Sequence, residues 1–393
     1  MIGELEIKVN ELVESLDNEL VELNKFLFDN PELGYEEFKS SKAHIDLLKK
    51  HGFEVEEGFL GIPTAFKAEY DSKKEGPSIG FLAEYDALPG IGHGCGHNIL
   101  GTTSTGAGIA LSKLIDDLGG KVLVFGTPAE ETSGAKVDMT NKGAFNNLDA
   151  ALIVHPEAKF IKSCPSLAMD AIQFIFKGRT AHAAAAPEKG INALDACIQT
   201  FNNINALRQH ILSTARIHGV IKEGGKAANI VPDLAVAQFY VRTLSKDYLR
   251  ELSEKVKNCA RAGAMAAGAE LEISNYEYSF DNLITNNALQ EDFIKNLNSL
   301  GITTIGETDL MMGSTDVGNV SQVCPTIHPM FAIADEGVDI VTHTVEFANA
   351  TLSDTAHKNM LITIKALVLT GVDVITDKEL LKNIKDEFQY NLK

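Results

Sequence analysis

Two short stretches of the sequence carry the residue types that bind metal ions and move protons. The first, GIGHGCGHN, places His93, Cys95 and His97 among four glycines. Glycine lets a backbone bend closely around a site, and a thiolate and an imidazole two residues apart can reach one metal ion or two adjacent ones. Taken alone, a Cys-x-His spacing more often marks a flexible turn with an incidental thiol.

The second stretch, PAEE, ends a strongly apolar run with the adjacent carboxylates of Glu130 and Glu131. Consecutive side chains point in different directions, so one carboxylate can bind a metal while the other takes a proton from the attacking water. A third run ends at His155, where a neutral imidazole can add a ligand. The alternatives are a solvated acidic loop and a structural histidine. Mixed nitrogen, oxygen and sulfur ligands suit zinc best, and ligand type alone also allows manganese, cobalt or nickel.

A competing motif lies next to the two glutamates. Ser133 and Lys136 fit the S-x-x-K spacing of serine acyl-transfer enzymes. The companion motifs S-D-N and K-T-G are absent from the sequence, and so is a G-x-S-x-G nucleophile elbow. Because a short motif needs its context, metal chemistry is favoured over serine chemistry.

The spacing of apolar residues predicts the elements that position these groups. A helix is expected from Val9 to about Asn30, and a second over 36–51 that Gly52 closes in a left-handed conformation. Apolar runs at 78–88, 121–130 and 148–157 predict buried strands, and a small-residue helix over 101–118 separates the first two. This alternation is typical of a doubly wound α/β sheet, in which ligands gather at the carboxyl ends of the strands. The three runs end in ionisable residues: Glu84 and Asp86, Glu130 and Glu131, and His155 and Glu157.

Residues 168–281 have a different pattern of apolar and polar residues. Their pattern follows the order β-α-β-β-α-β, which matches the ferredoxin-like arrangement. Alternating helix and strand patterns return after Asp281. We therefore expect a discontinuous metal-binding domain, 1–167 and 282–393, interrupted by an inserted domain at 168–281.

Composition limits the partners and the compartment. The chain has 393 residues, 45% of them hydrophobic, and 35 Lys+Arg against 54 Asp+Glu give a net charge of −19. Such an acidic chain without a basic block is a poor partner for nucleic acid or an anionic membrane. Five scattered cysteines favour a reducing compartment. The N-terminus shows no apolar signal region and the chain no run of about 18 apolar residues, so a cytoplasmic protein is expected.

The sequence resembles the M20 metallopeptidases, and within them the amidohydrolase branch, subfamily D. EYDALPGIGHGCGHN resembles the first metal loop of that family, PAEETSGAKVDMTNKGAF its catalytic glutamate loop, and HPE its next ligand segment. FDNPELGYEEF resembles its N-terminal signature, FKGRTAHAAAAPEKGINALDA and NIVPDLAVAQFYVR its lid domain, and THTVEFANATLSDTA its final histidine segment. The match covers nearly the whole chain. GSTDVGNVS is most similar to the aminobenzoyl-glutamate hydrolase and β-alanyl-lysine dipeptidase group.

The resemblance implies a role for several residues. The implied metal ligands are Cys95, His97, Glu131, His155 and His343, and the implied general base is Glu130. His182 would support the carbonyl oxyanion in the neighbouring subunit's site, and Asn229 would help to hold the substrate. Glu84 stands where more familiar branches have a histidine, so the roles of Glu84, Asp86 and Asp316 stay open between support of the site and structure.

The resemblance also implies a fold and an activity. The fold is a zinc-peptidase-like α/β catalytic domain with an inserted ferredoxin-like lid that forms a homodimer or a dimer-based oligomer. The activity is hydrolysis of an amide bond in small N-acyl or N-aminoacyl amino acids or dipeptides, with one or two divalent metal ions per subunit, zinc first. The alternative is a broader aminopeptidase, carboxypeptidase or endopeptidase that acts on longer peptides. A binding protein without activity would have a broken ligand set, whereas every matched position is present.

Overall fold

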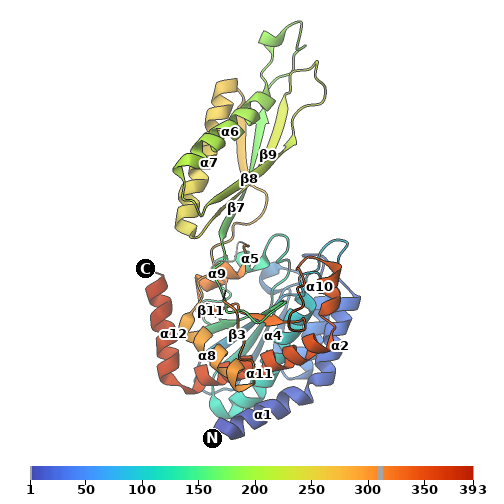
Figure 1. The fold of residues 1–393 in the computed structure, drawn as a ribbon, viewed down its shortest axis with the longest axis vertical. Helices are drawn as coiled ribbons and strands as arrows, with labels where there is room; N and C mark the ends of the chain where they lie inside the picture. The colour runs from blue at the N-terminus through green and yellow to red at the C-terminus, as the bar shows by residue number, and fades with distance from the viewer. Residues whose placement is uncertain (1, 308–312, 393) are drawn as a thin grey trace. The chain divides into compact units, whose positions relative to one another are not determined.

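The computed structural model describes residues 2–307 and 313–392. The chain divides into two compact units (Figure 1). Within the described residues, the first unit comprises 2–165, 283–307 and 316–392, and the second comprises 166–282 and 313–315. The second unit therefore interrupts the sequence of the first.

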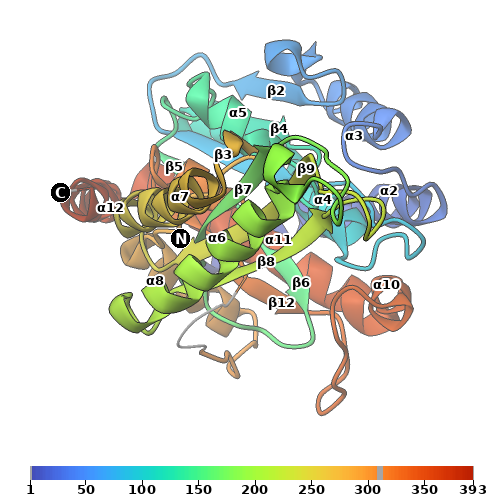
Figure 2. The same cartoon turned by 90° about the horizontal axis from the view of Figure 1, so that it is seen from above.

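A six-stranded mixed sheet forms the centre of the first unit, in the order β1-β2-β4-β3-β5-β11, of which β2, β4, β3 and β5 are labelled in Figure 2. The strands are β1 (Glu54–Glu57), β2 (Phe66–Asp71), β3 (Ser78–Ala83), β4 (Lys121–Gly126), β5 (Ala150–Leu152) and β11 (Thr326–Ile327). Those from β4 to β11 run parallel, whereas β2 is antiparallel to β4 and to β1. A separate parallel pair joins β6 (His155–Glu157) to β12 (Met330–Ala332). Because parallel strands end at one edge, the polar residues after β3, β4 and β5 gather there.

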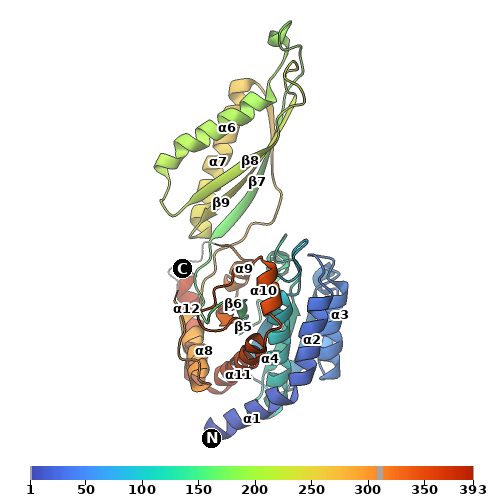
Figure 3. The same ribbon diagram turned by 45° about the vertical axis from the view of Figure 1, so that its right-hand side comes forward.

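Helices cover both faces of this sheet (Figure 3). On one face Phe81 and Val124 pack in a core with α1, α2, α4 and α11, and on the other Leu82 and Phe125 pack with α5 and α9. Burial on both faces explains why these strands are apolar throughout. The helices of the unit are α1 (Ile2–Ser15), α2 (Asp17–Asp29), α3 (Phe38–Lys50), α4 (His97–Leu118), α5 (Ala135–Asn141), α8 (Asn287–Ser299), α9 (Val317–Ser321), α10 (Val345–Ala350), α11 (Asp354–Thr376) and α12 (Lys378–Asn391).

Small residues let α4 lie directly on the sheet. A Cβ at Gly108 would lie 2.3 Å from a methyl carbon of Val124, and a Cβ at Gly101 would lie 2.3 Å from the carbonyl oxygen of Glu84. The helix can approach the end of β3 this closely only with glycine at these positions. The approach brings His97, the first residue of α4, over the residues that follow β3.

One helix among the described residues, Asp354–Thr376, is long and apolar enough to cross a membrane by length and composition. This helix, α11, packs instead in the core of the first unit, where Ile364, Leu367 and Val368 are fully buried. Its apolar composition is that of a core helix.

The second unit is a four-stranded antiparallel sheet with two helices. Its elements are β7 (Ala168–Lys177), α6 (Ala193–Leu207), β8 (Arg216–Glu223), β9 (Leu234–Thr243), α7 (Lys246–Ala267) and β10 (Glu270–Asn275). The sheet order is β10-β7-β9-β8, and α6 and α7 lie together on one face (Figure 3). Along β9 every second side chain is buried, as expected for a sheet with one covered face. The predicted ferredoxin-like order, and with it the α/β fold class, is confirmed.

The predicted element boundaries are wrong in three places. The first helix is divided at Leu16 into α1 and α2, and the first two strands end earlier than the apolar runs, at Ala83 and Gly126. Tyr85 and Ala129, beyond those ends, are fully buried although they lie in loops. Apolar periodicity cannot separate a buried loop from the strand before it, which explains the second error. The run at 148–157 is divided into β5 and β6, which belong to different sheets.

Candidate metal centre

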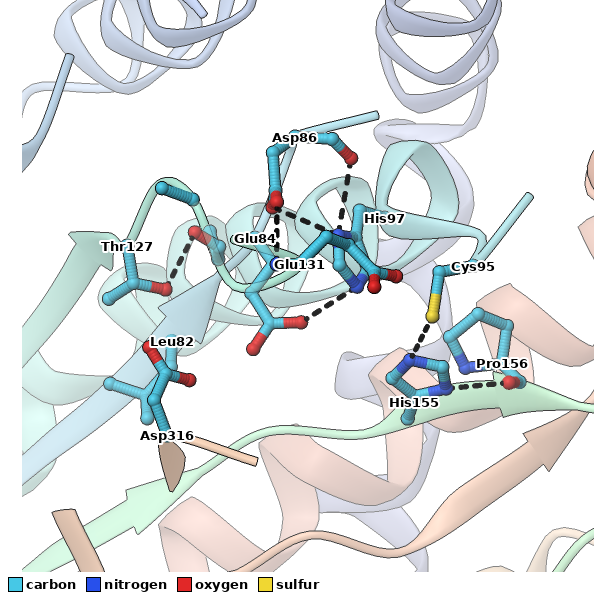
Figure 4. Close-up of polar contacts among 12 residues, drawn as sticks. Leu82, Glu84, Asp86, Cys95, His97, Thr127, Glu131, His155, Pro156 and Asp316 are labelled. Carbon is cyan, nitrogen blue, oxygen red and sulfur yellow. Dashed lines mark hydrogen bonds and ion pairs between the residues drawn. The ribbon is translucent and has the colours of Figure 1, made fainter. Parts of the chain in front are cut away.

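The glycine-rich loop joins the end of β3 to the start of α4. Gly96 precedes α4 with a φ of +79°, and a Cβ there would lie 2.5 Å from Cγ of Pro156. Glycine therefore lets the loop turn and pass against the segment that carries His155. The side chain of Cys95, just before Gly96, points to His155, and His97 lies close by on the first turn of α4 (Figure 4).

Asp86 sets the orientation of two neighbouring groups. Its Oδ1 lies 3.0 Å from Nδ1 of His97. Because a carboxylate only accepts hydrogen bonds, Nδ1 of His97 donates to Asp86, and Nε2 is the atom that can bind a metal ion when the ring is neutral. The other oxygen, Oδ2, accepts a hydrogen bond of 2.9 Å from the backbone N–H of Glu131. One buried side chain thus positions a histidine on α4 and a glutamate on the loop after β4.

A backbone carbonyl orients His155 in the same way. Nδ1 of His155 lies 2.7 Å from the carbonyl oxygen of Pro156, so Nδ1 donates and Nε2 faces Sγ of Cys95 at 3.4 Å. Burial, with the imidazoles of His328 and His97, lowers the pKa of His155 to about 4. The ring is therefore neutral near pH 7, which is the form that binds metals.

The predicted ligands come together in overlapping groups whose candidate ligand atoms lie within 4.8 Å of one another. These groups are Cys95 with His97 and His155, Cys95 with Glu131 and His343, and His97 with Glu130 and Glu131. Since Cys95 belongs to two of the groups, the arrangement can hold one ion or two ions that share the thiolate.

His343 reaches the site from a loop in the C-terminal part of the chain. Its Nε2 lies 3.4 Å from Oε1 of Glu131, and its backbone N–H donates a hydrogen bond of 2.7 Å to the carbonyl oxygen of Gly94. The backbone at His343 has a φ of +65°, in the left-handed region that histidine tolerates better than most residues. The side chain is 55% exposed, so this ligand lies at the open side of the cluster.

Glu130 lies beside the ligands and is surrounded by other carboxyl groups. Burial, together with the carboxylates of Glu84 and Glu131, raises the pKa of Glu130 well above its usual value. A carboxyl group with a raised pKa can take a proton from water and later return it to a leaving amine.

The donor set fits a divalent metal ion. Nε2 of His97 and Oε1 of Glu131 are buried and make no hydrogen bond within the described part of the chain. Burial raises the pKa of the Cys95 thiol well above its usual value. A cation among these atoms would bind Nε2 of His97 and Oε1 of Glu131 and favour the thiolate, and imidazole, carboxylate and thiolate are together typical zinc donors.

A network of buried charges lies behind His97. Nζ of Lys136 lies 2.7 Å from Oε1 of Glu84 and 2.7 Å from Oδ1 of Asp316, and none of these side chains is more than 1% exposed. The other oxygen of Glu84 lies 3.3 Å from Nε2 of His97. Against the effect of burial, Lys136 and His97 lower the pKa of Glu84 to about 2. Glu84 is thus an ionised carboxylate held under a candidate metal ligand.

The same network argues against the alternative in which Lys136 activates Ser133 as a nucleophile. Burial disfavours a charged lysine, but the carboxylates of Asp316 and Glu84 outweigh it and raise the pKa of Lys136 above its usual value. An S-x-x-K lysine must be neutral to accept a proton from serine. Lys136 therefore pairs with carboxylates and is not placed to activate Ser133.

The predicted substrate-contacting residues lie in the second unit, and both are exposed. The backbone N–H of Ala183, next to His182, donates a hydrogen bond of 3.0 Å to the carbonyl oxygen of Asn229. Nδ1 of His182 accepts hydrogen bonds from the backbone N–H groups of Ala184 and Ala185, at 3.3 and 3.2 Å. A neutral imidazole that accepts at Nδ1 carries its proton on Nε2, so His182 presents a hydrogen-bond donor.

Sequence reasoning missed His328. This residue is 5% exposed, its ring meets that of His155 edge to face with centroids 5.8 Å apart, and neither ring nitrogen makes a hydrogen bond among the described residues. A signal existed: His328 precedes Pro329 as His155 precedes Pro156. His155 and Pro156 begin β6, and His328 and Pro329 come directly before β12, which pairs with β6.

Comparison with known proteins gives concordant matches. Residues 169–266 match the peptidase dimerisation domain of the M20 family. The chain is 36% identical over 412 residues to the Xaa-Arg dipeptidase of Homo sapiens, covering 99% of this chain and 93% of that protein. It is 28% identical to a subunit of the p-aminobenzoyl-glutamate hydrolase of Escherichia coli, covering 97% and 94%. A crystal structure from Bacillus subtilis, described as a dinuclear metal binding peptidase from the M20 family, superposes with a TM-score of 0.67 at 19% identity, covering 92% and 100%.

The buried ion network gives a testable expectation for stability. Replacing Lys136 with Met leaves two buried carboxylates without their cationic partner, so we expect the free energy of unfolding to fall by about 3–5 kcal/mol. Lys142, which pairs with Asp138 at 2.7 Å but is 44% exposed, is the matched control. Lys142→Met should change the free energy by less than about 1 kcal/mol. Urea denaturation of the full chain measures the free energy of unfolding of both variants. Equal, small losses of free energy would contradict the burial and pairing of Lys136.

Proposed function

Because the chain belongs to the M20 family of metal-dependent peptidases and amidohydrolases, we propose that it cleaves dipeptides and N-acylamino acids at this metal centre. The reaction class is hydrolysis of an amide bond in a small substrate. The observation that carries the proposal is the convergence of ligand-type side chains from distant parts of the chain, with Glu130 beside them.

We assign the metal to Cys95, His97, Glu131, His155 and His343. Cys95 belongs to two groups of candidate ligands, so this set of residues would hold one or two ions. Zinc suits the mixed donors best. A bound divalent ion supplies two effects, a lower pKa for a water molecule and polarisation of the scissile carbonyl group.

Glu130 acts as the general base. Its carboxylate takes a proton from the attacking water and gives it to the leaving amine, which departs with the C-terminal amino acid. Glu131 cannot share this duty, because its carboxylate is assigned to the metal and its backbone N–H is bound to Asp86. The adjacent glutamates therefore divide binding and proton transfer.

His182 of the partner subunit supports the carbonyl oxygen. The proton on its Nε2 is available for donation, since Nδ1 already accepts two backbone hydrogen bonds. A donor aimed at the developing oxyanion contributes about 3 kcal/mol where such groups have been removed from other enzymes. Asn229, which is linked to the same segment through its backbone, contacts the substrate.

The second unit is assigned as the lid and dimerisation domain. Its outer strand β8 has only β9 as a neighbour among the described strands, and Val220 and Ile221 on it are 55% and 43% exposed. An apolar edge strand is a template for pairing with another chain. We therefore expect homodimers that form through the second unit.

We place the protein in the cytoplasm. All five cysteines are free thiols. A reducing compartment preserves such thiols, among them Cys95, which the proposed centre needs as a ligand. Nucleic acid and membranes are not proposed as partners of so acidic a chain.

Substrate choice is the first test of the proposal. The relative with 36% identity is named for a dipeptide with C-terminal arginine, and the one with 28% identity for an acylated glutamate. We therefore expect Xaa-Arg and Xaa-Lys dipeptides to give the highest kcat/KM, above aminobenzoyl-glutamate, N-acetylamino acids and tripeptides. Hydrolysis should stop on chelation and return with zinc or manganese. Preference for tripeptides or longer peptides would support the broader peptidase, and cleavage unaffected by verified metal removal would refute the metal mechanism.

A hybrid dimer tests whether His182 acts in the partner's site. Glu130→Ala and His182→Ala subunits are each expected to be inactive, but a mixed dimer holds one site with both groups intact. After subunit exchange at equal concentrations half of the dimers are mixed, so about a quarter of the wild-type activity should return. Mixing two batches of Glu130→Ala is the control. No recovery despite demonstrated exchange would mean that His182 serves its own subunit or lies outside the chemistry.

A further inference from the structure

The backbone just before the general base adopts an unfavourable conformation. Ala129, which precedes Glu130, has a φ of +61°, and Tyr35 on the facing segment has a φ of +65°. Residues with a Cβ avoid this left-handed region because the Cβ approaches the following carbonyl oxygen. Such conformations persist where the surroundings hold them, and they are frequent at functional sites.

Glu37 holds Ala129 in place. Oε1 of Glu37 accepts a hydrogen bond of 2.9 Å from the backbone N–H of Ala129, and both residues are fully buried. The carbonyl oxygen of Ala129 accepts a hydrogen bond of 2.8 Å from the N–H of Gly134. Both polar groups of this peptide segment are therefore fixed, one by a side chain from far away in the sequence.

The segment before Glu37 packs tightly on the same loop. A Cβ at Gly34 would lie 2.5 Å from Oγ1 of Thr132 and 3.0 Å from Cα of Ala129. There is no room for the loop to relax towards this side. The hydrogen bond that Ala129 donates to Glu37 and the packing of Gly34 together define one position for the loop.

The side chain of Glu37 has no part in capping its own helix. Glu37 is the N-cap residue of α3, yet its side chain makes no capping hydrogen bond. Glu32 does this instead, accepting from the backbone N–H groups of Lys39 and Ser40 at 3.1 and 2.8 Å. A purely helical role therefore belongs to Glu32, and the buried carboxyl group of Glu37 is directed at the loop of the base.

We propose that Glu37 is a positioning residue for the general base, which holds Ala129 in its left-handed conformation so that Glu130 points into the site. This inference rests on the proposed role of Glu130. Glu131 is held separately, through the hydrogen bond of its backbone N–H to Asp86. Loss of Glu37 therefore moves the base and leaves the metal ligand in place.

The test compares Glu37→Leu with Glu37→Gln. Leucine removes the acceptor, so kcat should fall by about 100-fold with KM and bound zinc unchanged, as expected for a displaced catalytic group. Glutamine keeps a carbonyl oxygen at the position of Oε1, so its kcat should stay within about threefold of wild type. Burial and the carboxylate of Asp86 already raise the pKa of Glu37 to about 7, which makes a neutral amide a close substitute. Glu36→Leu, at the exposed neighbouring position, is the matched control and should keep wild-type kcat.

A second measurement, in an Ala129→Gly protein, keeps the inference testable if Glu37→Leu folds poorly. Glycine at position 129 adopts a φ of +61° without steric cost, so Glu37→Leu should lower kcat much less in an Ala129→Gly protein than in wild type. Equal losses in both backgrounds, wild-type kcat in Glu37→Leu, or Glu37→Gln as impaired as Glu37→Leu would each overturn the inference. Glu130→Gln in the same assay separates the two hypotheses, because full activity there would refute the base itself and not its positioning.

Discussion

The carboxylate of Asp86 is the contact on which the geometry of the metal centre depends. One oxygen fixes the ring of His97 and the other fixes the backbone of Glu131. These two residues come from the start of α4 and from the loop after β4, so neither element alone can set their separation. A short loop after β3 carries Asp86 into the gap between them. The close packing of α4 on the sheet, which needs glycine at Gly101 and Gly108, is what makes that gap small enough to bridge.

The centre gathers an unusual amount of negative charge away from water. Glu84, Asp86, Glu130 and Asp316 lie near one another, with Lys136 as the buried cation among them. Burying charges costs free energy that pairing only partly returns. A divalent cation among the ligands would offset the remaining charge, so folding of this region and metal binding are coupled. The same surroundings raise the pKa of Glu130, which ties the electrostatics of the fold to proton transfer.

Much of the fold could be predicted from the sequence because the signals are local. The alternating runs and the β-α-β-β-α-β order identify both sheets, and the ionisable residues at the strand ends indicate one edge as the site. His343 could be identified only through the family resemblance, because no pattern in the sequence around it indicates that it lies near Cys95. The pairing of Lys136 with Asp316, and the contact of Glu37 with Ala129, join residues far apart in the chain. Periodicity and spacing carry no information on such contacts.

The proposed roles of Glu130, His182 and Asn229 rest on different kinds of observation. A carboxylate oxygen of Glu130 lies within 4.8 Å of the candidate ligand atoms of His97 and Glu131, and the proposed role of Glu130 rests on that placement. His182 and Asn229 lie on two segments of the second unit that are joined by a backbone hydrogen bond, and the proposed role of His182 requires assembly of two chains. The main hypothesis is therefore the division of labour between Glu130 and Glu131, which involves the first unit alone.

Measuring bound zinc and kcat in Glu130→Gln and Glu131→Gln on the best substrate tests that division of labour. We expect Glu130→Gln to keep its zinc and to lose about 100-fold to 10,000-fold in kcat, whereas Glu131→Gln should lose zinc and activity together. Wild-type turnover by Glu130→Gln, or zinc loss from Glu130→Gln with zinc retained by Glu131→Gln, would refute the assignment of the two glutamates.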